Sequence, residues 1–150
     1  MSIWKPSVTV AAVIEQHGKF LLVKERVEGR LVLNQPAGHL DPGESLADAC
    51  RREVLEETAH RFQPTGLVGI YRWHYAPKDL TFLRFCFLGN LEGADAARGL
   101  DQEIVSLEWL TPRELKTRRA EQRSPLVEQC VEDFLAGRNF PLELLSREFA

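Results

Sequence analysis

Apolar and β-branched residues dominate two short segments near the N-terminus. Residues 8–14 read VTVAAVI and residues 20–23 read FLLV, and a Gly-containing turn at 16–18 separates them. Runs of this length and composition are typical of strands, and the short turn predicts a hairpin. A third short strand is predicted at 31–33. The segment 34–44, NQPAGHLDPGE, is rich in Pro, Gly, Asn and Asp, which predicts a loop.

The segment 45–58 has the strongest helical pattern in the chain. It contains no Gly or Pro and is rich in Ala, Leu, Glu and Arg, which are good helix formers. At about 100° per residue, Leu46, Ala49, Cys50 and Val54 fall on one face of this helix. We expect that face to pack against the core.

The second half of the chain combines predicted strands with two predicted helices. Strands are expected at 66–75, 81–91 and 104–110, with a turn at 76–79 and a loop at 92–102. Thr111, Pro112 and Glu114 form the pattern of a capped helix start. A second helix is expected after Ser124 and Pro125, ending at Gly137. This order of elements indicates an α+β fold, and 150 residues suit a single domain spanning 1–150.

Composition and charge exclude several classes of protein. A hydrophobic content of 44% excludes global disorder, and the apolar runs are too short for a membrane span. A net charge of -3 is a poor match to a nucleic-acid binder, which usually carries a basic stripe. Cys50, Cys86 and Cys130 form no CxxC pair, so we expect reduced, buried cysteines. With no apolar signal segment visible, we expect a cytoplasmic protein, either a monomer or a homodimer.

Carboxylates interrupt the apolar face of the predicted helix. Glu53 and Glu57 lie within that face and Glu56 lies on its flank. Like charges three or four residues apart on a helix repel each other, more strongly where they are partly buried. A divalent cation would remove this repulsion, and oxygen ligands on a rigid helix suit Mg²⁺ or Mn²⁺. The helix alone also fits a solvated, acidic helix end that is paired with Arg51 and Arg52.

The spacing of residues before and within this helix is more specific than the carboxylate cluster. The segment 38–58, GHLDPGESLADACRREVLEET, has the form G-x5-E-x7-R-E-V-x-E-E. It resembles the Nudix box, G-x5-E-x7-R-E-U-x-E-E-x-G-U, in which U is apolar. The chain departs from that pattern at the end of the box, where Ala59 replaces the Gly and His60 replaces the apolar residue. These departures concern the end of the helix and leave the carboxylates in place.

The resemblance implies an α/β/α sandwich around a mixed β-sheet. It also implies a hydrolase that uses Mg²⁺ or Mn²⁺ and attacks phosphoanhydrides with water. By position, the metal site would consist of Gly38, Glu44, Glu53, Glu56 and Glu57, with Arg52 orienting a neighbouring carboxylate. The base that accepts the proton of water is then Glu56 or Glu57 in the box, or Glu103 on a later loop.

Further segments resemble a bacterial phosphatase branch of the family. They are residues 7–11, 34–40, 82–85, 123–127 and 141–143. This branch implies the release of orthophosphate from nucleoside di- and triphosphates and from hydroxymethylpyrimidine pyrophosphate. The alternatives are a pyrophosphatase of nucleotide-sugars or dinucleoside polyphosphates, and a domain that only senses a nucleotide. The retained box carboxylates argue against the last of these.

Five residues outside the box carboxylates are candidates for contact with a small phosphoanhydride substrate. Trp73 lies in a predicted strand, where it either stacks on a base or packs within the sheet. His39 lies in the loop beside the box, where it either binds phosphate or is an ordinary polar loop residue. Arg72 and Arg84 either meet phosphate or point to solvent. Arg123 precedes a predicted helix start, where backbone N–H groups favour anions.

Overall fold

Two β-sheets organise the computed structural model, which describes residues 2–95 and 97–145. The first sheet has the order β5-β1-β7-β6. Its strands are β1 (Ser7–Val13), β5 (Ala37–His39), β6 (His60–Tyr75) and β7 (Leu80–Ala94). Because β1 pairs with β7 in parallel and with β5 antiparallel, this sheet is mixed, as predicted.

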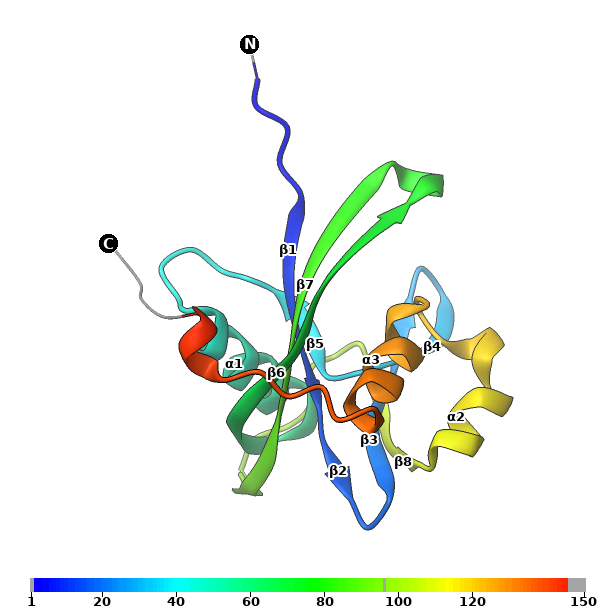
Figure 1. Ribbon diagram of the computed structural model, residues 1–150. Helices are drawn as coiled ribbons and strands as arrows, with labels where there is room; N and C mark the ends of the chain where they lie inside the picture. The colour runs from blue at the N-terminus through cyan, green and yellow to red at the C-terminus, as the bar shows by residue number, and fades with distance from the viewer. Residues whose placement is uncertain (1, 96, 146–150) are drawn as a thin grey trace.

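The second sheet is antiparallel and lies beside the first (Figure 1). Its central strand β3 (Lys19–Val27) pairs with β2 (Glu15–Gln16), β4 (Arg30–Asn34) and β8 (Ile104–Leu110). The hairpin predicted at the N-terminus therefore belongs to two sheets. Its first strand is β1 of the mixed sheet, and its second strand is β3, the central strand of the antiparallel sheet.

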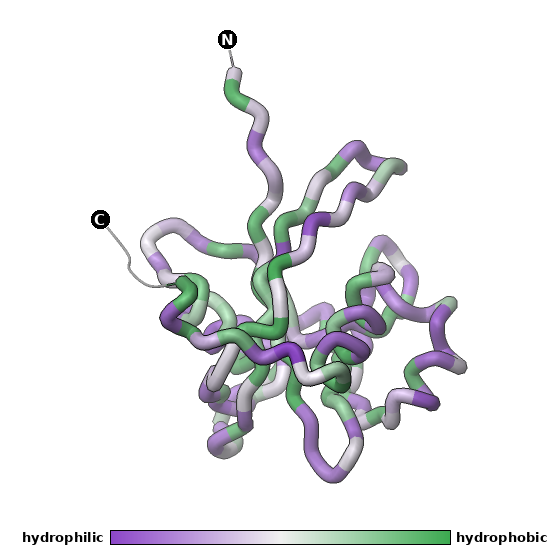
Figure 2. Tube along the Cα trace, in the orientation of Figure 1, coloured by the Kyte–Doolittle hydropathy of each residue, from purple (hydrophilic) through white to green (hydrophobic). Residues whose placement is uncertain are grey.

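Helices cover both faces of the mixed sheet, which confirms the predicted α+β sandwich. These helices are α1 (Leu46–Thr58) and α3 (Leu126–Leu135), whereas α2 (Pro112–Thr117) packs against α3 and β8. Short 3₁₀ turns lie at Ala76–Lys78, Arg119–Glu121 and Leu142–Leu145. Alternate residues of β1 belong to different core clusters: Val10 and Ala12 pack with the apolar residues of α1, and Ala11 and Val13 with those of α3. Figure 2 shows the central strands as hydrophobic and the peripheral loops as hydrophilic.

Local signals in the sequence account for the helix ends. The Ser45 hydroxyl accepts a hydrogen bond from the Asp48 amide (3.0 Å) and caps α1. Thr111 and Glu114 form the predicted capping box at the start of α2. At its other end α1 closes on Ala59, which has φ 57° and ψ 26° in the left-handed region. The missing Gly of the box thus leaves an alanine in a conformation that glycine adopts at much lower cost.

Three predicted boundaries are wrong. The loop at 34–44 contains strand β5, which forms because residues 37–39 pair with residues 9–11 of β1. The strand predicted from residue 66 begins at His60. Strand β6 lies at the edge of its sheet and has a register shift between Pro64 and Gly66, so the proline does not interrupt the pairing with β7. Strand β7 continues to Ala94, so the loop predicted at 92–102 begins later.

The three cysteines are free and buried, as predicted. Cys50 lies on α1, Cys86 on β7 and Cys130 on α3. Within residues 2–95 and 97–145, no helix is long and apolar enough to cross a membrane.

Candidate active site

Arg52 is the centre of a charged network between α1 and the loop that precedes it. Its Nε and Nη2 atoms donate to the two carboxylate oxygens of Glu44 at 3.0 and 2.7 Å. Its Nη1 atom donates to Glu53 at 2.7 Å and to Glu56 at 3.2 Å. The Nη2 atom also donates to the His39 carbonyl at 2.9 Å. The planar guanidinium therefore fixes β5, the loop and the helix relative to one another.

This network affects the acidity of its carboxylates in opposite ways. The hydrogen bond from Arg52 lowers the pKa of Glu44 below its ordinary value. Burial raises the pKa of Glu53, although the same arginine works in the opposite direction. The pKa of the Arg52 guanidinium is raised, first by its hydrogen bond with Glu44. Arg52 therefore stays charged, as an arginine that orients carboxylates must.

Glu57 lies deeper than the other box carboxylates, with 7% of its surface exposed. Its Oε1 atom accepts a hydrogen bond from the Ala37 amide at 2.8 Å. Burial raises the pKa of Glu57 to about 9, even though that hydrogen bond lowers it. The negative charges of Glu25, Glu53 and Asp101 raise the pKa further. Glu57 is thus a buried acid whose ionised form needs a cation nearby.

Gly38 lets strand β5 lie directly against the box helix. A Cβ atom at this position would overlap the carboxylate group of Glu53. Any side chain at position 38 would therefore displace Glu53 or move the strand. The loop glycine of the box therefore leaves room for the Glu53 carboxylate in its position beside Arg52.

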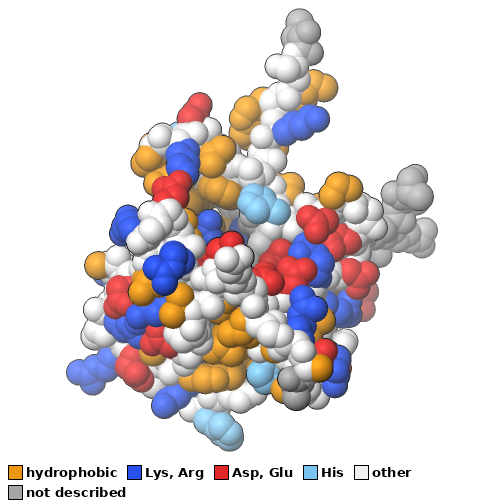
Figure 3. All heavy atoms as spheres, turned by 180° about the vertical axis from the view of Figure 1, so that it is seen from behind, with side chains coloured by type: hydrophobic (Ala, Val, Ile, Leu, Met, Phe, Trp, Pro, Cys, Tyr) orange, Lys and Arg blue, Asp and Glu red, His pale blue; other side chains and the backbone are white. Residues whose placement is uncertain are grey.

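Further carboxylates line a pocket together with Glu57, and we call it the acidic pocket. This open pocket of about 340 Å³ is lined by Glu25, Glu57, Asp101 and Glu103, together with Arg26 and Arg123. Glu103 is exposed on the turn before β8, so the structure brings this predicted base to the same pocket as Glu57. Figure 3 shows acidic and basic side chains intermingled on the face seen from behind.

Sequence reasoning missed Glu25 and Asp101. Glu25 is buried on β3, where it accepts hydrogen bonds from Arg123 at 2.7 Å and from the Asn34 amide at 3.4 Å. The Asp101 amide donates to the Glu56 carbonyl at 3.0 Å, which ties its loop to the end of α1. Both residues lie far from the box in sequence. Only the pairing of distant strands brings them to the site.

Glu44, Glu53 and Glu56 surround Arg52, whereas Glu57 is bound to the Ala37 amide, so the box carboxylates do not converge on a single point. Within the described part of the chain, no three Asp, Glu, His or Cys side chains are placed to hold a metal ion. The donors nevertheless fit a divalent cation, because they are oxygen atoms and because Glu57 is buried among like charges. A cation bound here would compete with Arg52 for Glu53 and Glu56.

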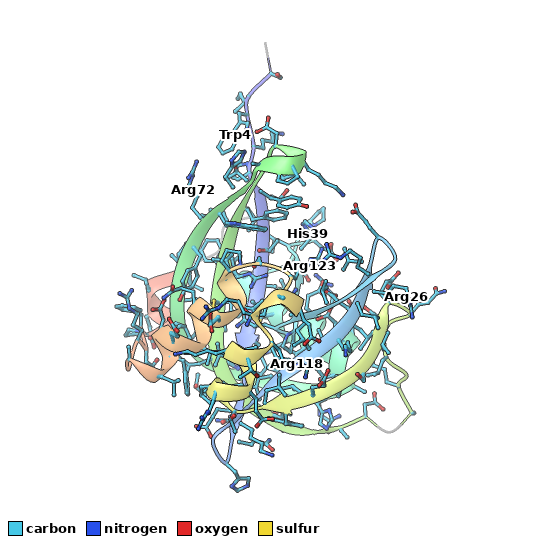
Figure 4. The ribbon with its side chains drawn as sticks, turned by 90° about the vertical axis from the view of Figure 1, so that its right-hand side faces the viewer. Trp4, Arg26, His39, Arg72, Arg118 and Arg123 are labelled. Carbon is cyan, nitrogen blue, oxygen red and sulfur yellow. The ribbon has the colours of Figure 1, made fainter. Side chains whose placement is uncertain are left out.

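A second hollow, which we call the aromatic cavity, borders strand β5. It measures about 90 Å³, and its lining includes Asn34, Gly38, His39, Trp73, Phe82, Arg84 and Arg123. Trp73 and Phe82 stack with their centroids 5.6 Å apart, so Trp73 both packs within the sheet and faces the cavity. In Figure 4, His39 and Arg123 lie near each other beside the space between the β6–β7 hairpin and strands β3 and β4.

The two predicted strand arginines have different environments. Arg84 is buried with 8% of its surface exposed, and its Nη1 atom donates to Gln35 at 2.9 Å. Arg72 is exposed on β6 and is absent from the lining of the aromatic cavity. Figure 4 shows Arg72 pointing away from the centre of the molecule. The structure thus joins Arg84, but not Arg72, to the other candidate residues.

Comparisons with known proteins bear on this geometry. A NUDIX domain pattern matches residues 4–130. The chain belongs to the Nudix family. The curated Phosphatase NudJ of Escherichia coli strain K12 is 38% identical over 142 residues, covering 95% of this chain and 92% of the relative. NudJ of Shigella boydii serotype 4 is equally similar, with the same coverage.

Solved structures support the Nudix assignment. A NUDIX hydrolase from Nitrosomonas europaea superimposes with a TM-score of 0.93 at 52% identity, covering 96% of this chain and 98% of the other. A MutT NUDIX hydrolase from Burkholderia pseudomallei has a TM-score of 0.74 at 20% identity, covering 87% and 98%, and shares the fold. This Nudix protein is therefore a phosphoanhydride hydrolase that acts on a small molecule. Nudix hydrolases generally use divalent metals.

Proposed function

We propose that this Nudix protein is a Mg²⁺-dependent phosphatase of nucleoside di- and triphosphates and of hydroxymethylpyrimidine pyrophosphate. Mn²⁺ is the alternative metal. The observation that carries the proposal is the position of Glu57, a buried carboxylate that lines the acidic pocket and interacts with the charge of Glu53. Similarity to NudJ over 95% of the chain supports the phosphatase branch.

The residues proposed to hold the metal are those that match the box: Gly38 through its carbonyl, Glu44 through water, and Glu53, Glu56 and Glu57. When bound, a divalent cation neutralises phosphate oxygens and lowers the pKa of bound water. Arg52 positions Glu44, Glu53 and Glu56 through the hydrogen bonds described above. The planar guanidinium holds these carboxylates in a fixed geometry relative to one another.

The proton of the attacking water goes to a carboxylate of the acidic pocket. Glu57 and Glu103 both line that pocket, whereas Glu56 accepts a hydrogen bond from Arg52 at 3.2 Å and forms an ion pair with it. Glu103→Gln separates the two candidates. If Glu103 is the base, this variant lowers kcat and removes the acidic limb of the pH–rate profile while metal affinity stays unchanged. If Glu57 is the base, Glu103→Gln leaves kcat close to that of the wild type.

Arg123 and His39 are proposed to hold the phosphate chain. Arg123 lines both the aromatic cavity and the acidic pocket, so it stands where a substrate would pass from one to the other. His39 lines the aromatic cavity next to Gly38. A diphosphate that spans this boundary would have its terminal phosphate at the carboxylates and the remainder of the molecule in the cavity.

Identification of products tests the proposal and its alternative. With Mg²⁺, a nucleoside diphosphate should yield nucleoside monophosphate and orthophosphate. Glu53→Gln should cut kcat by roughly a hundredfold, as expected for an electrostatic group at the reacting centre. Efficient cleavage of a nucleotide-sugar or a dinucleoside polyphosphate into two phosphorylated fragments would instead establish the pyrophosphatase alternative. Turnover of none of these compounds would leave a domain that only senses a nucleotide.

A further inference from the structure

A third hollow, which we call the hairpin groove, lies between the β3–β4 hairpin and the β6–β7 hairpin. It measures about 180 Å³, and its lining includes Glu28 of the first hairpin and Trp73, Tyr75 and Lys78 of the second. Figure 1 shows the tip of the β6–β7 hairpin projecting beyond the rest of its sheet, above the β3–β4 turn. The width of this groove therefore depends on how the two hairpins are held relative to each other.

The hairpin groove adjoins both hollows of the candidate site. It shares Trp73 and Phe82 with the aromatic cavity and Glu28 with the acidic pocket, and Arg123 belongs to the lining of all three. A substrate with its terminal phosphate at the carboxylates and its remainder in the aromatic cavity would extend next into the groove. The groove is therefore where the far end of a long substrate would lie.

Both hairpin tips are two-stranded and extend past the strands that flank them. Strand β1 pairs with β7 from Ser7 and Phe82 onward, so residues 74–81 have only each other as strand partners. Strand β8 pairs with β3 as far as Glu25, so residues 27–30 lie beyond the third strand of their sheet. Two-stranded ribbons are only marginally stable on their own. The two tips are therefore free to move relative to each other unless a contact joins them.

One ion pair joins the two tips. Lys78 Nζ, on the 3₁₀ turn of the β6–β7 hairpin, donates to Glu28 Oε1 at the β3–β4 turn. Across both hairpins, which the structure describes in full, no other hydrogen bond or ion pair connects one hairpin to the other. Both side chains are more than half exposed, and ion pairs of this kind are weak and screened by salt. The contact between the tips is therefore one that breaks readily.

The wall of the groove on the β6–β7 side is an aromatic row. The ring centroids of Tyr75 and Trp73 are 5.4 Å apart, and those of Trp73 and Phe82 are 5.6 Å apart. These three side chains pack on one another along a single hairpin, so they move with it as a unit. A change in the width of the groove is therefore a movement of this row relative to the β3–β4 hairpin, which is the movement that the ion pair between Glu28 and Lys78 restrains.

We propose that the Glu28–Lys78 pair is a latch across the mouth of the hairpin groove. While the pair is formed, the far end of a substrate must fit within about 180 Å³. When the pair breaks, the tips separate and a longer substrate extends past them into solvent. The pair is therefore a specificity-determining element that favours phosphoanhydrides with a small non-reacting part. This inference rests on the proposed phosphatase function, because it explains how that site would disfavour dinucleoside polyphosphates.

A nucleoside diphosphate and a dinucleoside tetraphosphate provide the test, and the measured quantity is the ratio of their kcat/KM values. Lys78→Met should shift this ratio toward the dinucleoside tetraphosphate by about two- to fivefold, the change that an exposed ion pair supports. Glu28→Gln should do the same, and adding Lys78→Met to it should produce no further change. Lys116→Met is the matched control, because it removes an exposed ion pair with Glu132 at a position outside the three hollows. It should keep the wild-type ratio.

The ratio reports on the latch whichever compound the wild type prefers. An unchanged ratio in both single variants would overturn the latch and leave the phosphatase function standing. Additive effects of Lys78→Met and Glu28→Gln would also overturn it, because the two residues would then act separately and not as a pair.

Fluorescence quenching without substrate separates this inference from the proposed function. Replacing Trp4 and Trp109 with Phe leaves Trp73, which lines the groove, as the sole tryptophan. In this background, quenching by acrylamide should increase on Lys78→Met. An ionic strength of about 1 M should increase it when Lys78 is present but not in the Lys78→Met variant, because salt screens the pair. These changes would support the latch even if no phosphoanhydride is hydrolysed, whereas equal quenching with and without Lys78 would refute it.

Discussion

The replacement Glu57→Gln should stabilise the metal-free protein. Glu57 is buried, and its pKa is raised to about 9, chiefly by burial. The folded metal-free protein therefore keeps a proton on this carboxyl, whereas the unfolded chain releases it near pH 4.5. Glutamine resembles the protonated acid and can still accept the hydrogen bond from the Ala37 amide.

The size of the effect follows from proton linkage. Because the pKa of the acid is higher in the folded state, stability is fully present below about pH 4.5 and falls as pH rises toward 9. Each pH unit in that window costs about 1.4 kcal/mol, so the wild type loses on the order of 3 kcal/mol by pH 7. The glutamine variant has no ionisable group at position 57, so it does not lose this stability as pH rises. Its advantage should be small at pH 5 and largest above pH 8.

Urea unfolding in the presence of a chelator measures this difference. The free energy of unfolding is compared between wild type and Glu57→Gln at pH 5, 7 and 8, with exposed Glu92→Gln as the control. We expect the gap for Glu57→Gln to widen with pH and that for Glu92→Gln to stay near zero. Added Mg²⁺ should stabilise the wild type far more than the variant. A gap that does not change with pH would refute the assignment of a buried, uncompensated acid.

Three further results are expected. Arg52→Lys should lower kcat at least about tenfold in steady-state assays, because an ammonium cannot make the paired bonds to Glu44; unchanged kcat would contradict a positioning role. Ala59→Gly should raise the free energy of unfolding by roughly 0.5–1 kcal/mol in urea titrations, because φ at this site is 57°; a loss of stability would contradict the strain. Thiol reagents should leave native activity intact, since the buried cysteines lie outside the lining of both hollows; inactivation that substrate prevents would place a thiol at the site. The cysteines concerned are Cys50, Cys86 and Cys130.

Local sequence was sufficient for the helix that carries the box. The helical pattern and the Ser45 cap predict Glu53 and Glu57 on the inner face of α1, and in the structure Glu57 is buried and Glu53 is half-buried. Strand β5 could not be predicted in this way. Its residues look like a loop, and they form a strand only because β1 lies beside them.

The same limit applies to the site. The spacing of the box identifies Gly38 and Arg52, and the structure supplies the reason: close contact with Glu53 and the network of hydrogen bonds. Glu25 and Asp101 carry no local signal, because their role depends on folding of distant strands toward Glu57. The ion pair that joins the two hairpin tips appears only when both hairpins are placed.

Hydrolysis of a nucleoside diphosphate in ¹⁸O-labelled water with Mg²⁺ tests the central claim most directly. Mass spectrometry of the products shows which phosphorus atom the water attacked. Attack at the terminal phosphorus places the label in orthophosphate and leaves the nucleoside monophosphate unlabelled, which is the predicted result. Label in the nucleoside monophosphate, or no hydrolysis with any divalent metal, would contradict the account.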